Sequence, residues 1–325
     1  MMKPLPRNEE ELLEEISSLD FSTSQEPRVK LMKCIRNSKE IGRSLNHVSI
    51  LLVGTAGVGK STIVNHLLGV DWAKTDEFKS KTRSTKEYII YGCDPKYEVE
   101  KLPLGLVDTP GFCDTDGSRQ EACNLLCMQE FFHTHRTLSK CFPNLIFLVV
   151  KATDNRIDGE NSQLGKALRC IKQLGLVDLK SPNVIVILTH VCSIRKINDE
   201  EWSGALDNMK KTVKKIVSNK LKVSAPVVLI ENKYKDCKLE RCNDYTLLPN
   251  GEWQPRNLYE ACARRLMKNA DGLGLITLNS IFRKSKKDDY CITVGLEFEA
   301  KIASQCILKS EDETMVEFLK IAAQE

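Results

Sequence analysis

The sequence predicts a three-layer α/β fold, in which a mostly parallel sheet of six strands is covered by helices on both faces. Apolar runs typical of buried strands alternate along the chain with helical segments, as they do in parallel sheets. Short polar motifs follow several of these runs, at the strand ends where α/β folds bind ligands. The expected strands are residues 48–53, 88–91, 102–107, 145–150, 184–188 and 226–230.

The α/β domain is expected to occupy residues 27–280, after a polar arm with a short helix over residues 1–26. Pro27 can open the first helix of the domain, residues 27–45, because the first helical position needs no N–H. Further helices are expected over residues 118–140, 160–175, 199–221 and 255–267.

Residues 281–325 form a C-terminal extension. Within it, residues 296–308 and 314–323 have the pattern of short amphipathic helices, and residues 283–287 are basic. We expect this part to pack on the domain or to contact an effector or a membrane surface.

The composition is that of an ordinary globular chain of 325 residues, 42% hydrophobic and 28% charged. A net charge of +4 is too small to indicate nucleic-acid binding. We find no signal peptide and no apolar run approaching about eighteen residues, so we expect a cytoplasmic protein, or one peripheral to a membrane, without a transmembrane helix.

The cysteines show no regular framework, and we interpret all 13 as reduced thiols. Cys123 and Cys127 precede two histidines, His133 and His135, but the spacing is not that of a standard zinc finger and the segment has a helical pattern. A loop holds Cys237 and Cys242, which can bind a metal or oxidise.

Residues 54–62 follow the first strand, lead into a helix and fit the pattern G-x-x-x-x-G-K-[ST]. The glycines let successive N–H groups point at a phosphate, and the helix N-terminus adds a positive dipole end. The lysine can reach β- and γ-phosphates, and the serine hydroxyl can bind Mg²⁺. The expected nucleotide contacts are Gly54, Thr55, Ala56, Gly57, Val58, Gly59, Lys60, Ser61 and Thr62.

A second motif, Asp108-Thr109-Pro110-Gly111, ends the third expected strand. Asp108 can hold Mg²⁺ through water, and the Gly111 N–H can meet a γ-phosphate. At this distance from the glycine loop the motif favours a GTPase over a kinase or transporter ATPase. The polar stretch of residues 71–86 is where a mobile loop can supply a threonine to Mg²⁺; we choose Thr85, with Thr82 as the alternative.

Together with Thr189-His190 and Glu231-Asn232, these motifs resemble the paraseptin-like GTPases, which include the immunity-associated GTPases (GIMAP) and the chloroplast outer-envelope import-receptor GTPases. The resemblance covers about residues 27–280 and is strongest to the import receptors at residues 227–232 and 247–253. It implies a P-loop G domain that binds GTP or GDP with Mg²⁺. Because no C-terminal transmembrane anchor is visible, we infer no chloroplast role.

Guanine must be recognised by an unusual route, because Thr189-His190-Val191-Cys192 lacks the aspartate that most small GTPases use. The resemblance implies that Glu231 accepts the guanine protons, that Asn232 contacts the base, and that His190 stacks on it or hydrogen-bonds it. An unpaired donor in such a site costs about 1–3 kcal/mol, so some acceptor is required.

Phe112 stands where many GTPases carry a water-positioning glutamine, so we expect slow hydrolysis. The resemblance implies that Arg156 reaches across a nucleotide-dependent dimer interface, where an arginine can bind phosphate oxygens. We therefore expect a slow GTPase that dimerises or assembles further with GTP bound. The alternative is a GTP-bound scaffold with negligible hydrolysis; an ATPase or kinase is disfavoured.

Overall fold

The computed structural model describes the strands, the glycine loop and most helices of the α/β domain. The described residues are 48–68, 73, 75, 84–92, 104–111, 124–125, 128, 143–154, 157, 162–194, 198–233, 237–242, 245–268, 283–284 and 290–299. Several expected segments lie outside them: the arm, the helix over residues 27–45, most of the helix over residues 118–140, and the helix over residues 314–323.

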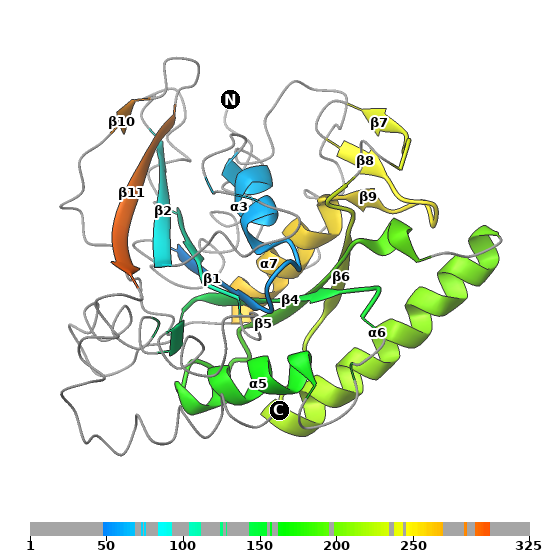
Figure 1. The fold of residues 1–325 in the computed structure, drawn as a ribbon, viewed down its shortest axis with the longest axis horizontal. Coiled ribbons are helices and arrows are strands. Elements are labelled where there is room, and N and C mark those ends of the chain that lie inside the picture. Colours follow the sequence, from blue (N-terminus) through cyan, green and yellow to red (C-terminus); the bar gives the residue numbers. More distant parts are fainter. Residues whose placement is uncertain are drawn as a thin grey trace.

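Among the described residues, the main sheet has eight strands in the order β10-β11-β2-β3-β1-β4-β5-β6 (Figure 1). Six of these strands are those predicted: β1 (Val48–Gly54), β2 (Ser84–Gly92), β3 (Leu104–Asp108), β4 (Leu145–Lys151), β5 (Val184–Thr189) and β6 (Val227–Ile230). The neighbours from β3 to β6 pair in parallel, while β2 runs antiparallel to β3. The predicted mostly parallel six-stranded sheet is thus confirmed.

Helices cover both faces of the sheet (Figure 1). One face packs against α3 (Lys60–Leu68) and α7 (Arg256–Lys268), and the other against α5 (Gln163–Gln173) and α6 (Asp199–Leu221). Side chains alternate across β1, so Ile50 joins the first core and Leu51 the second. Burial on both faces explains why the strands are continuous apolar runs.

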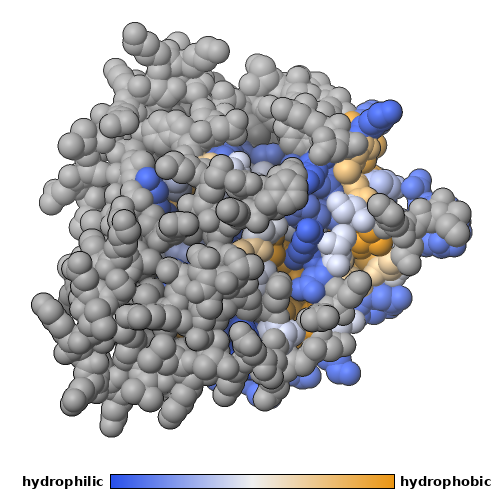
Figure 2. Space-filling view, viewed as in Figure 1, coloured by the Kyte–Doolittle hydropathy of each residue, from blue (hydrophilic) through white to orange (hydrophobic). Residues whose placement is uncertain are grey.

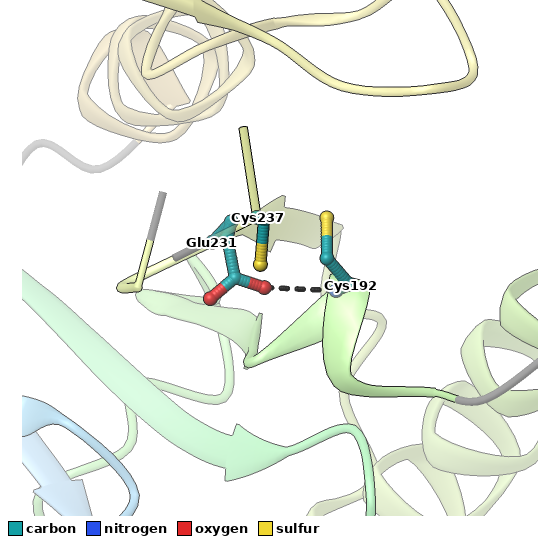
Figure 3. A group of neighbouring side chains, drawn as sticks. All are labelled: Cys192, Glu231 and Cys237. Carbon is teal, nitrogen blue, oxygen red and sulfur yellow. Dashed lines mark hydrogen bonds between the residues drawn. The ribbon is translucent and has the colours of Figure 1, made fainter. Parts of the chain in front are cut away.

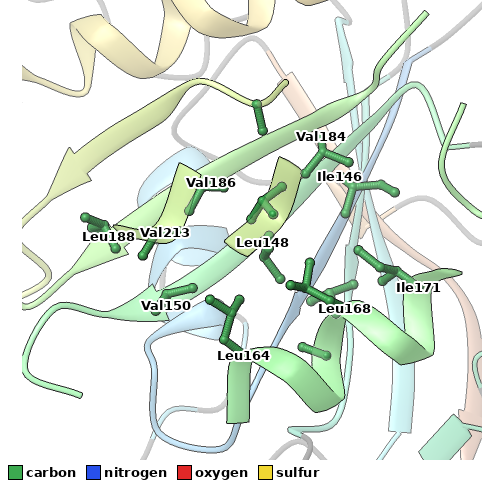
Figure 4. Close-up of a cluster of buried hydrophobic side chains, with 14 of the residues drawn as sticks. Ile146, Leu148, Val150, Leu164, Leu168, Ile171, Val184, Val186, Leu188 and Val213 are labelled. Atoms are coloured by element: carbon green, nitrogen blue, oxygen red, sulfur yellow. The ribbon is translucent and has the colours of Figure 1, made fainter. Parts of the chain in front are cut away.

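The second core shows how the outer helices are fixed to the sheet (Figure 4). Leu164, Leu168 and Ile171 of α5 pack against alternate residues of β4 and β5. The predicted helix over residues 199–221 is confirmed as α6, whose N-cap Asn198 accepts a hydrogen bond from the Glu201 N–H at 2.8 Å.

Figure 2 shows hydrophilic side chains with small apolar patches among them over the described part of one face. Leu179, 69% exposed, is the one large hydrophobic side chain strongly exposed among the described residues. No helix within this part of the chain is long and apolar enough to cross a membrane.

A second, three-stranded sheet lies where the sequence predicted only a loop. It consists of β7 (Arg241–Cys242), β8 (Tyr245–Leu247) and β9 (Trp253–Gln254), all antiparallel. Strands of two or three residues are too short to show an alternating pattern, so sequence periodicity could not reveal them.

The predicted helix over residues 296–308 is wrong at its start, because residues 296–299 belong to the long strand β11 (Tyr290–Glu299). That strand pairs antiparallel with β2, and the short β10 (Arg283–Lys284) pairs with β11. Its β-branched and aromatic residues suit a strand, and the open edge of β2 offers hydrogen-bonding groups that a helix could not satisfy.

Candidate nucleotide-binding site

The glycine loop lies between β1 and α3 and curls around the amine of Lys60. The Lys60 Nζ donates to the Gly54 carbonyl at 3.1 Å and to the Thr55 carbonyl at 2.9 Å, and the side chain is 6% exposed. The loop therefore holds a positive charge at the N-terminal end of a helix, which is a favourable place for a phosphate.

The loop glycines are required by conformation and by close packing. Gly57 and Gly59 have φ angles of +73° and +92°, which side chains rarely adopt. Gly54 has a different reason: a Cβ there would lie 2.4 Å from the carbonyl oxygen of Val149 in β4. The loop thus rests directly on the neighbouring strand.

Two hard oxygen ligands meet beneath this loop. The Ser61 hydroxyl at the start of α3 donates to Asp108 Oδ2 at 2.6 Å, and Asp108 is 1% exposed at the end of β3. Strands β1 and β3 pair in parallel with Leu52 opposite Asp108, so Asp108 lies beside the start of the glycine loop and within reach of Ser61. A hydroxyl and a carboxylate suit Mg²⁺, so the residues present fit the predicted metal.

Thr85 lies inside β2, not in a loop before the strand as its sequence position suggested. Its neighbour Lys86 pairs with Asp108 in the β2–β3 register, so the Thr85 backbone lies one residue from the position opposite Asp108, and alternation places the Thr85 side chain on the other face of the sheet. The Thr85 side chain is fully buried, and its hydroxyl has no hydrogen-bond partner among the described residues. The alternative, Thr82, lies outside the described residues.

The turn after β3 packs against the glycine loop. A Cβ on Gly111 would lie 2.4 Å from the backbone nitrogen of Ala56, so only glycine fits there. The Thr109 hydroxyl donates to the Leu52 carbonyl at 2.6 Å, and the Asn124 amide donates to the Gly111 carbonyl at 3.3 Å. The predicted switch turn therefore touches the phosphate loop directly.

The ends of β5 and β6 converge on the other side of the same loop. The Thr189 hydroxyl donates to the Val58 carbonyl at 2.7 Å, and His190 Nδ1 lies 3.0 Å from that hydroxyl oxygen. His190 has a left-handed φ of 55° and is 8% exposed. From β6, the Asn232 amide donates to the Gly59 carbonyl at 3.3 Å, while Asn232 Oδ1 is buried without a hydrogen-bond partner among the described residues.

Glu231 is fully buried and organises the backbone around it. Its Oε2 accepts from the Cys192 N–H at 2.8 Å and its Oε1 from the Lys233 N–H at 2.7 Å. Its own N–H donates to Gln254 Oε1 at 2.6 Å, and Gln254 Nε2 donates back to the Glu231 carbonyl at 3.0 Å. The sequence did not indicate Gln254, because nothing in its local pattern points to a partner 23 residues away along the chain.

The Cys192 thiol lies beside Glu231 and Cys237 (Figure 3). Burial, followed by the nearby Glu231 and Cys237, raises the pKa of Cys192 above its ordinary value. The sequence suggested Cys237 with Cys242 as a metal or redox pair, whereas the fold brings Cys237, from the segment between β6 and β7, next to Cys192 after β5.

Arg156 lies outside the described residues, but the chain on both sides of it is described. The Asp154 N–H donates to the Lys151 carbonyl at 3.0 Å, so the chain turns directly after β4, and Ile157 is buried. Because β4 runs parallel to its neighbour β1, the chain toward Arg156 leaves the sheet at the carboxyl ends of the strands, where the glycine loop also begins. The histidines and cysteines of residues 123, 127, 133 and 135 also lie outside the described part.

Three features lie together at the carboxyl ends of the parallel strands: a phosphate loop, a serine–aspartate pair for Mg²⁺, and a glycine turn against the loop. They define a P-loop domain with the fold of a GTPase G domain. Residues 49–190 match the family model described as 50S ribosome-binding GTPase. The match spans β1 to His190 and therefore contains the phosphate loop, the switch turn and the end of β5.

Known proteins similar to this chain include chloroplast translocon GTPases. Translocase of chloroplast 90 from Arabidopsis thaliana is 24% identical over 269 residues, covering 80% of this chain and 31% of that protein. The crystal structure of Toc33 from the same plant with GDP and Mg²⁺ has a TM-score of 0.56 at 19% identity, covering 76% of this chain and 94% of Toc33.

A further similar structure, with a TM-score of 0.55 at 20% identity, covers 75% of this chain and 92% of its own. For the chloroplast translocon components atToc33 and psToc159, to which this structure relates, dimerization is important for the GTPase activity. At these identities the likeness establishes the fold. The chain spans about a third of the length of translocase of chloroplast 90.

Proposed function

We propose that the protein binds GTP with Mg²⁺, hydrolyses it slowly, and works as a switch that dimerises in a nucleotide-dependent way. The observation that carries this proposal is the contact of Ser61 with Asp108, directly below a loop closed around Lys60. P-loop NTPases hold Mg²⁺ with such a hydroxyl and carboxylate, so this contact supports a nucleoside triphosphate with Mg²⁺. The packing of the Asp108–Gly111 turn on the glycine loop supports a GTPase among them. The placement in the paraseptin-like group is also a proposal, supported by the similar fold of Toc33.

The phosphates would replace the loop carbonyls as partners of the Lys60 amine. Ser61, Asp108 and Thr85 would hold Mg²⁺, Asp108 through water. When bound, Mg²⁺ neutralises charge on the phosphate oxygens. Thr85 would join Ser61 and Asp108 after a rearrangement at the start of β2, and its hydroxyl supports this, because a buried hydroxyl without a partner among the described residues costs about 1–3 kcal/mol that a ligand can recover.

We propose that guanine lies against His190 and Asn232. Both side chains adjoin Gly59, so the base would sit beside the loop that binds its phosphates. Asn232 Oδ1 is the acceptor with no partner among the described residues. Both Glu231 oxygens already accept backbone N–H groups, so Glu231 would place the base-reading segment and use its remaining lone pairs for the guanine protons.

Hydrolysis would depend on a second molecule. Phe112 cannot orient a water as a glutamine does, and the loop of Arg156 starts at the nucleotide edge of the sheet. We propose that Arg156 reaches the phosphates of a partner G domain. The stated importance of dimerization for the GTPase activity of atToc33 and psToc159 supports this proposal.

Phosphate release under multiple turnover, measured at several protein concentrations, tests the dimer. We expect the rate per chain to rise with concentration, and Arg156→Ala to remove that rise. Arg264→Ala is the matched control, because Arg264 is exposed on α7. If Arg156→Ala leaves both the rate and GTP-dependent self-association unchanged, the dimer proposal fails.

The second candidate is a GTP-bound scaffold that recruits partners through its C-terminal part. Phe112 in place of glutamine is the observation that favours it. A flat rate near zero at all concentrations, with GTP retained, would support the scaffold. Competition of labelled GTP by GTP and by ATP tests the base assignment for both candidates, and Lys60→Ala should lose nucleotide binding.

A further inference from the structure

Three metal-ligating groups from two strand ends meet beside the proposed guanine site. Cys192 follows β5, while Glu231 and Cys237 follow β6. Their ligand atoms, two sulfurs and a carboxylate oxygen, all lie within 4.8 Å of one another. Figure 3 shows the three side chains beside one another, with the Cys237 thiol next to the Glu231 carboxylate.

The donor set selects the kind of ion. Two thiols and one carboxylate suit a thiophilic divalent cation such as Zn²⁺, whereas Mg²⁺ and Ca²⁺ prefer oxygen ligands alone. With Zn–S bonds of about 2.3 Å, tetrahedral ligands lie about 3.8 Å apart, so the present spacing requires at most a movement of about 1 Å. Cys192 and Cys237 are only partly buried, so water can supply a fourth ligand.

The environment of the Glu231 carboxylate favours binding of a cation. Glu231 is fully buried, and no lysine or arginine among the described residues forms an ion pair with it. A buried carboxylate without a positive partner is costly, even when hydrogen-bonded. The N–H groups of Cys192 and Lys233 fix its orientation and leave one lone pair on each oxygen, so one oxygen can bind a metal while the other remains for the guanine protons.

We propose that Cys192, Glu231 and Cys237 form a binding site for one thiophilic divalent ion of the Zn²⁺ class. Binding forms two metal–thiolate bonds and one metal–carboxylate bond, and each thiol gives its proton to solvent. The ion joins the segment after β5 to the segment after β6. It thereby fixes Glu231 and the chain around His190 and Asn232, which the GTP proposal uses for the base.

The first test is Zn²⁺ binding to the nucleotide-free full chain in competition with a chromophoric chelator. We expect one tight site per chain, which Cys192→Ser and Cys237→Ser each weaken by about 100-fold or more, since even outer-shell changes cost about 10–100-fold. Cys170→Ala is the control, because Cys170 is buried on α5 away from the cluster. Binding unchanged in both serine variants would overturn the proposal, as would the absence of a stoichiometric site in the natural chain.

The second test uses Co²⁺ as a spectroscopic probe in the same variants. Thiolate-to-cobalt charge-transfer bands should appear in the natural chain and in Cys170→Ala, and should weaken in each serine variant. Glu231→Gln is less informative, because Glu231 also holds the backbone and its loss can unfold the site. A cobalt spectrum without charge-transfer bands would exclude thiolate ligation and contradict the assignment.

Protection of the thiols gives a third, independent measurement. Saturating Zn²⁺ should slow alkylation of Cys192 and Cys237, mapped by mass spectrometry, and should prevent their oxidation to a disulfide. Equal reaction with and without Zn²⁺ would argue against the site. Because these measurements need no nucleotide, they can fail while GTP binding holds, and GTP binding can fail while they hold.

Discussion

Substitution of Gly59 directly tests the contact between the phosphate loop and Asn232, which we propose binds the base. The φ of +92° at Gly59 strains any side chain, and a Cβ would lie 1.9 Å from the Asn232 amide nitrogen. Gly59→Ala must therefore both strain the loop and displace Asn232. We expect a cost of about 1–3 kcal/mol, equivalent to a loss of nucleotide affinity of about 5- to 150-fold.

Two matched variants separate the strain from the displacement. Gly57→Ala, at φ +73°, and Gly251→Ala, at φ +78°, introduce a Cβ with nothing within 4 Å. Thermal unfolding and binding of a fluorescent GTP analogue, with ATP as competitor, would be measured for all three. Only Gly59→Ala should reduce the preference for GTP over ATP. If it unfolds like Gly251→Ala and keeps affinity and preference, Asn232 does not act through Gly59.

The remaining predictions concern the metal, the core and the pH dependence of stability. Ser61→Ala should weaken GTP binding about tenfold or more in Mg²⁺ but little in EDTA, since it removes a metal ligand; equal losses in both would exclude that role. Leu148→Ala should lower the free energy of unfolding by about 2–5 kcal/mol in urea, because Leu148 is fully buried. Burial raises the pKa of Cys262, so the folded thiol keeps its proton where the unfolded one loses it. As the pH rises above about 8.5, the stability of the natural chain should therefore fall relative to Cys262→Ala; parallel curves would refute this.

The central sheet could be predicted because its signals are local. The apolar runs of β1, β4 and β5 are buried on both faces, and buried parallel strands carry this pattern in consecutive residues. Helix α6 has the bounds predicted for it, and local features account for its start, since Asn198 caps it and three acidic residues occupy its first turn. The phosphate loop was predicted for the same reason, since its chemistry lies in one short stretch.

Contacts between distant segments could not be predicted in the same way. The two hydrogen bonds between Gln254 and Glu231 join residues 23 positions apart, and nothing in either local sequence indicates the partner. The left-handed conformation of His190 also depends on its surroundings, because residues other than glycine rarely adopt it. The sequence also could not show that both oxygens of Glu231, the expected acceptor for the base, accept backbone N–H groups.

The pairing of β2 with β11 links the proposed switch to the C-terminal part of the chain. In this register Thr85 stands opposite Phe298, and backbone hydrogen bonds couple the two strands along most of their length. A displacement of β2 that accompanies nucleotide exchange must therefore move β11 or break that ladder. If nucleotide binding moves β2 as proposed, β11 is the element of the C-terminal part that receives the movement first.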